Sequence, residues 1–224
     1  MKNIVVFTGA GISAESGLGT FRDSEGLWEK YKIEDVATPE AFQRNPKLVL
    51  DFYNIRRRQL LGSSPNKAHF ALNKLEKRFN LDIITQNVDN LHESSGSSRV
   101  LHLHGNLMEA RSTIDDSVYI LTKSDLNIGD KCDKGGQLRP NVVWFGENVP
   151  NMSIAIKKVM YADIFLIIGT SLNVYPAASL IDYALNSKRI IIIDPNAEFR
   201  KGVEVIRQKA SVGVPQVVEN ILSL

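Results

Sequence analysis

The stretch Gly9-Ala10-Gly11-Ile12-Ser13-Ala14 follows the apolar run Asn3–Thr8, and together they decide the fold class. The run is short, rich in β-branched residues and ends at a glycine, which is typical of a buried strand. The next six residues match the G-x-G-x-x-G/A pattern, in which glycines let the backbone turn tightly and approach a pyrophosphate. A helix beginning there would present unpaired N–H groups to the phosphates. A simple tight turn also fits these glycines, but their place after a strand favours nucleotide binding.

Similar patterns along the chain predict a parallel sheet. Apolar runs predict further strands over Leu81–Thr85, Val100–Leu103, Asp163–Gly169 and Arg189–Asp194. Helical spacing of apolar residues predicts helices over Pro39–Leu61, Asn66–Phe79, Ala177–Asn186 and Pro215–Leu222. Strands that alternate with helices imply an α/β fold with a doubly wound, Rossmann-like parallel sheet.

Two stretches interrupt this alternation and are richer in polar and turn residues. We therefore expect a single domain over residues 1–224, in which a smaller lobe formed by about 24–62 and 104–140 is inserted. The Rossmann-like lobe would comprise about 1–23, 63–103 and 141–224. A length of 224 residues suits one such domain.

Composition excludes several classes of protein. The formal net charge of +2 gives no reason to expect nucleic-acid or membrane partners, and no run approaches 18 apolar residues. The basic run Arg56-Arg57-Arg58 is by default a solvated helix face. One cysteine, Cys132, excludes an intramolecular disulfide and a four-thiolate zinc site. We expect a cytoplasmic protein, and the oligomeric state stays undetermined.

The usual acid on the second Rossmann strand is missing. Instead, Gly17–Asp23 carries an aromatic side chain and a cation, and such a segment could fold over a bound cofactor. Asp194, at the end of a later strand, is the candidate ribose acid. It is equally well explained as a residue that starts a turn before Pro195.

Polar residues follow two other predicted strands. Thr85–Asn90 carries amides and an acid that could read an amide and ribose hydroxyls, although Asn87 or Asp89 could also serve as a helix N-cap. His102 and His104 share one face of an extended segment. A lone histidine is more often structural, and the pair could suggest a metal, but no further ligands lie nearby at ligand spacing. The place of His104 at a strand end before a glycine favours catalysis.

Five motifs together resemble the sirtuin family of NAD-dependent protein lysine deacylases. They are GAGISAESGLGTFRD (9–23), TQNVDNLHESSG (85–96), LHLHGN (101–106), VVWFGE (142–147) and GTSLNVYPAA (169–178). The resemblance spans essentially the whole chain in the family's order. It implies NAD as cofactor, acyl-lysine proteins or peptides as partners, and His104 and Asn87 as catalytic residues.

The resemblance also implies which residues bind NAD. These are Gly9, Ala10, Gly11, Ile12, Glu15, Thr20, Phe21, Arg22, Gln86, Asn87, Asp89, Gly169, Thr170, Ser171, Asp194, Asn196 and Ala210. Whether Asp194 or Asn196 meets the adenosine ribose stays open. The acyl oxygen would attack C1′ of the ribose and expel nicotinamide, after which His104 would take a proton from a ribose hydroxyl. The products would be free lysine, nicotinamide and an O-acyl-ADP-ribose.

One branch of the family, the class III sirtuins of bacteria and mitochondria, carries a Tyr-x-x-Arg pair for acidic acyl groups, which Tyr53 and Arg56 match. Both would lie on one helix face, where a phenol and a guanidinium can bind a carboxylate. Core packing for Tyr53 and a surface charge for Arg56 are the alternatives. Ala37 matches a small residue that leaves room for a longer acyl chain. The run Val142–Glu147 would form an alternating β edge to which a peptide can add as a strand, with Val143, Trp144, Phe145 and Gly146 binding the substrate. A plain core strand, in which Val143 and Phe145 face one way and Trp144 the other, also fits this run.

The sequence departs from the family at its zinc ribbon, since three of the four expected cysteines are missing. We predict that the small lobe binds no metal and is held together by packing of Val118, Tyr119, Ile120 and Leu121.

Two rival functions are an NAD glycohydrolase or ADP-ribosyltransferase, and a noncatalytic nucleotide-binding module. The sequence does not show whether the protein prefers acetyl groups or the acidic succinyl and malonyl groups.

Overall fold

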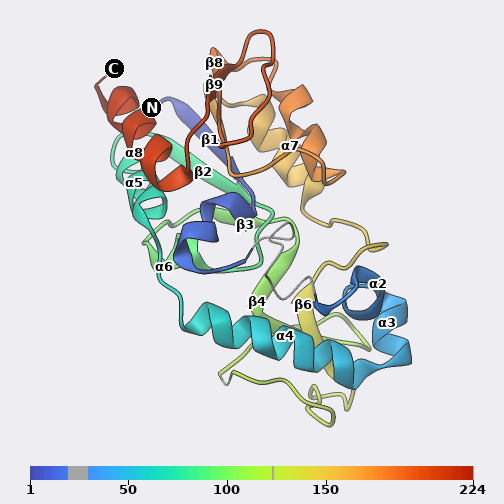
Figure 1. The fold of residues 1–224 in the computed structure, drawn as a ribbon. Helices are drawn as coiled ribbons and strands as arrows, with labels where there is room; N and C mark the ends of the chain where they lie inside the picture. Colours follow the sequence, from blue (N-terminus) through green and yellow to red (C-terminus); the bar gives the residue numbers. More distant parts are fainter. Residues whose placement is uncertain (20–29, 123, 224) are drawn as a thin grey trace.

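The computed structural model describes residues 1–19, 30–122 and 124–223. Its larger lobe contains a six-stranded parallel sheet of order β3-β2-β1-β7-β8-β9 (Figure 1). The strands are β1 Asn3–Thr8, β2 Asn80–Thr85, β3 Val100–His102, β7 Ile164–Ile168, β8 Arg189–Ile193 and β9 Glu204–Ile206. The predicted α/β fold with a Rossmann-like sheet is confirmed.

Helices cover both faces of this sheet because alternate residues of each strand point to opposite sides. Ile4 and Val6 pack with α5 (Lys67–Leu75) and α8 (Ala210–Leu222). Val5 and Phe7 pack with α7 (Met152–Met160) and the 3-10 helix η3 (Ala177–Tyr183). Figure 1 shows these two helical layers on opposite sides of β1, with both chain termini at the same end of the large lobe.

A smaller lobe lies beside the sheet, as expected. Its antiparallel sheet has the order β5-β4-β6. The strands are β4 Gly105–Ser112, β5 Val118–Ile120 and β6 Leu138–Val142. The helices are α2 Ile33–Val36, α3 Pro39–Arg44 and α4 Pro46–Leu61. Helix α4 runs along this lobe (Figure 1). Its residues Phe52 and Tyr53 belong to the apolar core of the lobe.

Several predicted elements have different bounds. The helix predicted over Pro39–Leu61 is two helices, because Pro46 disfavours helical geometry at Asn45, whose side chain instead caps α4 by accepting from the Leu48 N–H. The helix predicted over Asn66–Phe79 is helix only to Leu75. The glycine motif is followed by two 3-10 turns, η1 Ala10–Ile12 and η2 Ala14–Ser16, and not by an α-helix.

The C-terminal half differs in similar ways. The predicted helix Ala177–Asn186 is a 3-10 helix that ends at Tyr183, and the closing helix begins at Ala210, five residues before Pro215. Helix α7 and strand β9 were not predicted, and neither was the antiparallel pairing in the small lobe.

The packing expected of Val118, Tyr119, Ile120 and Leu121 is present only in part, because Leu121 packs against a buried cluster but Val118 and Ile120 of β5 do not. Val118 and Ile120 are 53% and 81% exposed. Within the lobe, a buried polar network joins helix α4 to strand β4 and to the loop at Ser124. Arg57 of α4 donates to the carbonyl oxygens of Leu107 (2.6 Å) and Ser124 (3.0 Å). Arg57 is fully buried, so the run Arg56–Arg58 is not a uniformly solvated face.

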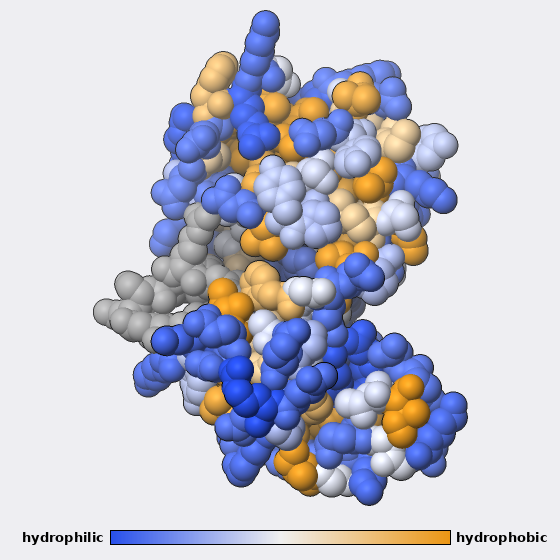
Figure 2. Space-filling view, turned by 90° about the vertical axis from the view of Figure 1, so that its right-hand side faces the viewer, coloured by the Kyte–Doolittle hydropathy of each residue, from blue (hydrophilic) through white to orange (hydrophobic). Residues whose placement is uncertain are grey.

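The surface in Figure 2 is mainly hydrophilic, with apolar side chains scattered in small groups over both lobes. Within the described residues, no helix combines the length and apolar character that crossing a bilayer requires.

Candidate active site

The glycine loop after β1 packs directly on the end of β7. The Gly9 N–H donates to the Ile168 carbonyl (3.0 Å), and the Gly11 N–H donates to the Gly169 carbonyl (2.9 Å). A Cβ at Gly11 would lie 2.7 Å from the Gly169 Cα, and Gly169 has a φ of +61° with no space for a side chain. The predicted cofactor residues Gly9, Gly11 and Gly169 therefore meet at the carboxyl edge of the sheet, where ligands of such folds bind.

The loop after β2 joins this edge through side-chain hydrogen bonds. Gln86 Nε2 donates to Thr170 Oγ1 (3.0 Å), and Asn87 Nδ2 donates to Ser13 Oγ (3.1 Å). Three strand ends are thus tied together by Gln86, Asn87 and Thr170, which the sequence assigned to NAD binding, and by Ser13, which it did not.

Asp89 is 6% exposed in the same loop. Its Oδ1 accepts from the Leu91 N–H (3.1 Å) just before α6 (Leu91–Ser94). The N-cap of this helix is Asn90, so neither Asn87 nor Asp89 is the N-cap that the sequence offered as an alternative. Burial raises the pKa of Asp89, while the bonds to Leu91 and Ser13 oppose the rise. A ligand-binding role for Asp89 stays a prediction.

His104 lies two residues beyond β3 and is half-buried. Its Nδ1 is 3.0 Å from the backbone carbonyl oxygen of Gln86, which only accepts hydrogen bonds. Nδ1 therefore carries the proton, and the Nε2 lone pair is left to act as a base. Burial lowers the pKa of His104, and the bond to Gln86 offsets part of that fall.

His102 supports the neighbouring backbone. Its Nδ1 bonds the Asn87 carbonyl (3.0 Å) and its Nε2 contacts Glu93 Oε1 (2.8 Å). Burial would lower the pKa of His102, but Glu93 and the Asn87 carbonyl together raise it. The two histidines do contact the same loop, and both ring nitrogens of His102 are engaged.

Tyr53 and Arg56 lie one helical turn apart on α4. Tyr53 is 1% exposed, and the guanidinium carbon of Arg56 is 6.0 Å from the centre of its ring. Burial lowers the pKa of Arg56, which the charges of Tyr53 and Asp89 partly offset. The interaction with Asp89 brings this pair to the loop that carries Asn87. Ala37 is buried in the same apolar cluster as Tyr53 and Trp144.

The structure forms no strand over the predicted β edge at Val143–Gly146, and the role of these residues in binding a peptide stays a prediction. Strand β6 ends at Val142, and a turn follows in which the Glu147 N–H donates to the Trp144 carbonyl (3.0 Å). Gly146 has a φ of +91°, which breaks the extended geometry. The N–H groups of Val143 and Phe145 bond the carbonyls of His104 and Ala37, so they are already used inside the protein. Phe145 is 46% exposed, whereas Trp144 is buried.

The remaining predicted cofactor residues lie near the same edge in different settings. Glu15 accepts from the backbone and side chain of Ser211 at the start of α8 (3.1 and 2.8 Å). Asp194 accepts a hydrogen bond from the Asn196 N–H (2.8 Å), as expected of a residue that starts a turn before Pro195. The side chains of Ile12 and Ala210 are buried in the apolar core. Ala10 is half-buried and Ser171 is exposed. Thr20, Phe21 and Arg22 lie outside the described residues.

No metal cluster is found in the part of the chain that the structure describes: no three His, Cys, Asp or Glu side chains are grouped for one ion. Cys132 is buried against Ser112, with 3.3 Å between Sγ and Oγ.

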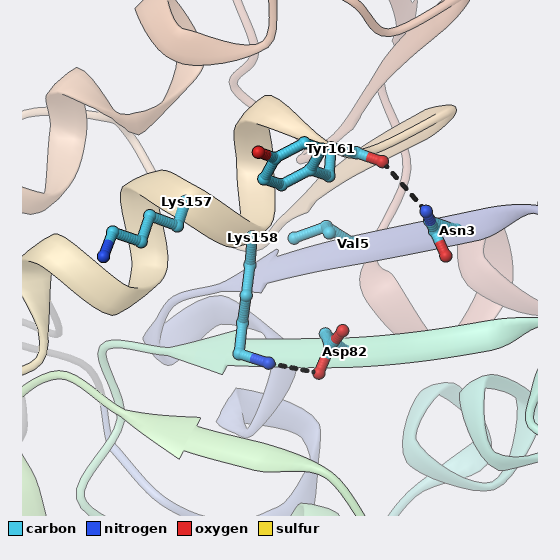
Figure 3. A pocket seen from close by; sticks show the side chains of 6 residues that line it. All are labelled: Asn3, Val5, Asp82, Lys157, Lys158 and Tyr161. Atoms are coloured by element: carbon cyan, nitrogen blue, oxygen red, sulfur yellow. Dashed lines mark hydrogen bonds and ion pairs between the residues drawn. The ribbon is translucent and has the colours of Figure 1, made fainter.

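A shallow pocket of about 230 Å³ lies elsewhere, at the opening residues of β1 (Figure 3). Lys158 and Asp82 face each other across it, 2.7 Å apart, and Arg99 also pairs with Asp82. The charges of Lys158 and Asp82 are paired, and Asn3 begins β1 at the amino edge of the sheet, away from the strand ends described above.

A family model described as the Sir2 family matches residues 9–176. The chain belongs to the Sir2 family. This Sir2 protein is 51% identical to an NAD-dependent protein deacylase of Bacteroides thetaiotaomicron, over 99% of each chain. It is 50% identical to an NAD-dependent protein deacylase of Helicobacter pylori, over 100% of this chain and 99% of the relative.

Solved Sir2 structures share the fold. A Sir2 homologue in complex with NAD is 39% identical, with a TM-score of 0.90 over 99% of this chain and 90% of that one. A Sir2 protein bound to an acetylated peptide is 29% identical, with a TM-score of 0.82 over 97% and 92%.

Two parts of this Sir2 site escaped the sequence reasoning. Ser13 lies within the motif 9–23 and accepts a hydrogen bond from the Asn87 side chain, a contact that the motif does not indicate. The bond from Trp144 Nε1 to Tyr53 Oη (3.0 Å) joins residues 91 positions apart, and no spacing pattern signals such a contact.

Proposed function

We propose that the chain removes acyl groups from lysine side chains with NAD as co-substrate, and that its pocket accepts acyl groups that end in a carboxylate, such as succinyl or malonyl. The buried, hydrogen-bonded donors and acceptors at the carboxyl edge of the sheet fit a dinucleotide. The glycine loop, Gln86, Asn87, Asp89 and Thr170 would hold it. Bound NAD supplies an electrophilic ribose carbon whose bond to nicotinamide can break.

The protein's own groups have distinct tasks in this proposal. Asn87, fixed by Ser13 and His102, orients the ribose. His104 Nε2 takes a proton from a ribose hydroxyl, and its Nδ1–H stays on the Gln86 carbonyl throughout. General-base assistance of this kind is worth about 10²–10⁴-fold in rate.

The observation that carries the acyl preference is the burial of Tyr53 and Arg56 together beside the Asn87 loop. A guanidinium and a phenol suit a carboxylate, to which they donate charge-assisted hydrogen bonds. Tyr53 and Arg56 place these two groups one helical turn apart on α4, and this pairing supports a substrate carboxylate better than an acetyl methyl group.

The test compares acetyl-lysine and succinyl-lysine forms of one peptide, with NAD, on wild type and Arg56→Met. Losing a hydrogen bond to a charged group costs about 1.5–3 kcal/mol. We expect kcat/KM for the succinyl peptide to fall about 10–100-fold, with little change for the acetyl peptide. Arg58→Met is the matched control, because Arg58 is exposed on the same helix and should leave both rates unchanged. Equal loss on both peptides in Arg56→Met would contradict the carboxylate pocket.

The same assay separates the rival activities. Consumption of NAD without any acyl peptide would indicate a glycohydrolase. No turnover with any peptide would indicate a noncatalytic nucleotide-binding module.

A further inference from the structure

Trp144 and Tyr53 form a buried hydrogen bond whose direction is fixed. The indole Nε1 only donates, so the phenol oxygen of Tyr53 accepts it, at 3.0 Å. The Trp144 side chain comes from the turn after β6, and Tyr53 comes from α4. Both residues are 3% exposed or less. The bond therefore connects the turn to the helix that carries Arg56.

Trp144 is held on more than one side. Its backbone N–H donates to Glu147 Oε2 (2.7 Å), and the guanidinium carbon of Arg139 lies 3.3 Å from the centre of its ring. Arg139 is in turn paired with Glu147 through two bonds of 2.7 and 3.0 Å. Phe42 packs at 5.4 Å between ring centres. Because these contacts fix the indole ring, its Nε1–H points in one direction, toward the Tyr53 hydroxyl.

The phenol of Tyr53 keeps its proton available. A phenol O–H lies near the ring plane, and the indole N–H occupies one side of the oxygen, so the proton is turned to the other side. Among residues 1–19, 30–122 and 124–223, no hydrogen bond accepts that proton. Burial raises the pKa of Tyr53 to about 12, so the phenol is a donor throughout the working pH range.

We propose that Trp144 is a positioning residue for acyl specificity: its N–H orients the Tyr53 hydroxyl so that the phenol proton is donated to the carboxylate of the substrate's acyl group. Arg56 lies one turn along the helix and supplies the charge. This inference rests on the proposed function, because an acetyl group offers no carboxylate to receive the proton.

The test is a double-mutant cycle with Trp144→Phe and Tyr53→Phe, measured on the acetyl and succinyl peptides. Trp144→Phe keeps an aromatic ring near Arg139 and removes the N–H donor together with part of the ring volume; the volume loss should affect both peptides alike, whereas the loss of the donor should affect only the succinyl peptide. A net hydrogen bond is worth about 0.5–1.5 kcal/mol, so KM for the succinyl peptide should rise about 3–10-fold, with kcat and the acetyl parameters nearly unchanged. In the Tyr53→Phe background, Trp144→Phe should add no further loss.

Other outcomes have definite meanings. Losses that add in the double variant, or that fall equally on both peptides, would show that Trp144 only packs, and would overturn the inference. If Trp144→Phe does not fold, Trp144→Met fills the space without a donor and serves in its place. Selective loss in Arg56→Met without any effect of Trp144→Phe would overturn the inference alone. A wild type that deacetylates but never desuccinylates would overturn the proposed acyl preference as well.

Discussion

The Nδ1 atom of His104 lies 3.0 Å from the backbone carbonyl oxygen of Gln86, and this contact settles which ring nitrogen carries the proton. The carbonyl belongs to the loop that also holds Asn87, so the base and the ribose-orienting amide of the proposed mechanism are placed by one segment. Because the acceptor is main chain, no side-chain substitution at Gln86 removes it.

The pH dependence of activity follows from this environment. Burial lowers the pKa of His104 below its usual value of about 6.5. A general base works in its neutral form, so kcat/KM should be flat near pH 7 and should fall as the pH drops through a midpoint below about 6.5. Rates on the acetyl peptide between pH 4.5 and 8 would show this, and a midpoint above 7 would contradict it.

Gly11→Ala should damage the glycine loop. A Cβ there would lie 2.7 Å from the Gly169 Cα and 2.9 Å from its carbonyl oxygen, so the loop or the end of β7 must move. Overpacking of this kind costs about 1–3 kcal/mol. Calorimetry should find a lower Tm and weaker NAD binding. Gly62→Ala is the control, since its nearest contact would be 3.6 Å and its φ of −87° suits alanine; equal behaviour of the two variants would refute the packing argument.

Arg57→Met should destabilise the small lobe. The substitution leaves the Leu107 and Ser124 carbonyls and the Asn54 side chain without their donor in a buried site. We expect a loss of at least about 2 kcal/mol in the free energy of unfolding, measured with urea. Arg58→Met on the exposed side of the same helix should change the midpoint very little. A wild-type midpoint in Arg57→Met would show that the network contributes nothing.

Two buried histidines should make stability depend on pH. Burial lowers the pKa of His69 to about 4 and that of His92 well below its usual value. The unfolded chain therefore binds more protons between pH 6.5 and about 4, so stability is lost as the pH falls through that window. Each histidine contributes a slope of about 1.4 kcal/mol per pH unit.

The comparison that isolates this effect is wild type against His69→Gln. Other titrating groups, including Asp89, are common to both proteins and cancel in the difference. The variant should show a shallower loss of stability between pH 6.5 and 4. Identical slopes would mean that His69 is not neutral and buried in the folded protein.

The sequence predicted the central strands well because each is a short apolar run buried on both faces. It failed where tertiary pairing decides the structure. The edge strand β9 has only three residues, and the pairing of β4 with β6 joins segments whose polar character does not indicate a sheet. The helix break at Asn45, by contrast, has a local signal, because a residue that precedes proline is disfavoured in a helix.

In the candidate site, too, some features follow from local sequence patterns and others depend on tertiary contacts. His104, Asn87 and the glycines follow predicted strand ends, so their meeting at one edge follows from parallel topology. The burial of Arg57 inside a run of three arginines is different, because its partners Leu107 and Ser124 are 50 and 67 positions away. Similarly, the turn after Val142 depends on Glu147 and Ala37 accepting backbone N–H groups.

The most direct test of the central claim measures loss of the acyl group from a lysine peptide, with NAD, by wild type and by His104→Ala. Mass spectrometry follows the peptide, and calorimetry measures NAD binding to both proteins. We predict that turnover falls by about 10²–10⁴-fold while NAD still binds the variant. Undiminished deacylation by His104→Ala would contradict the account.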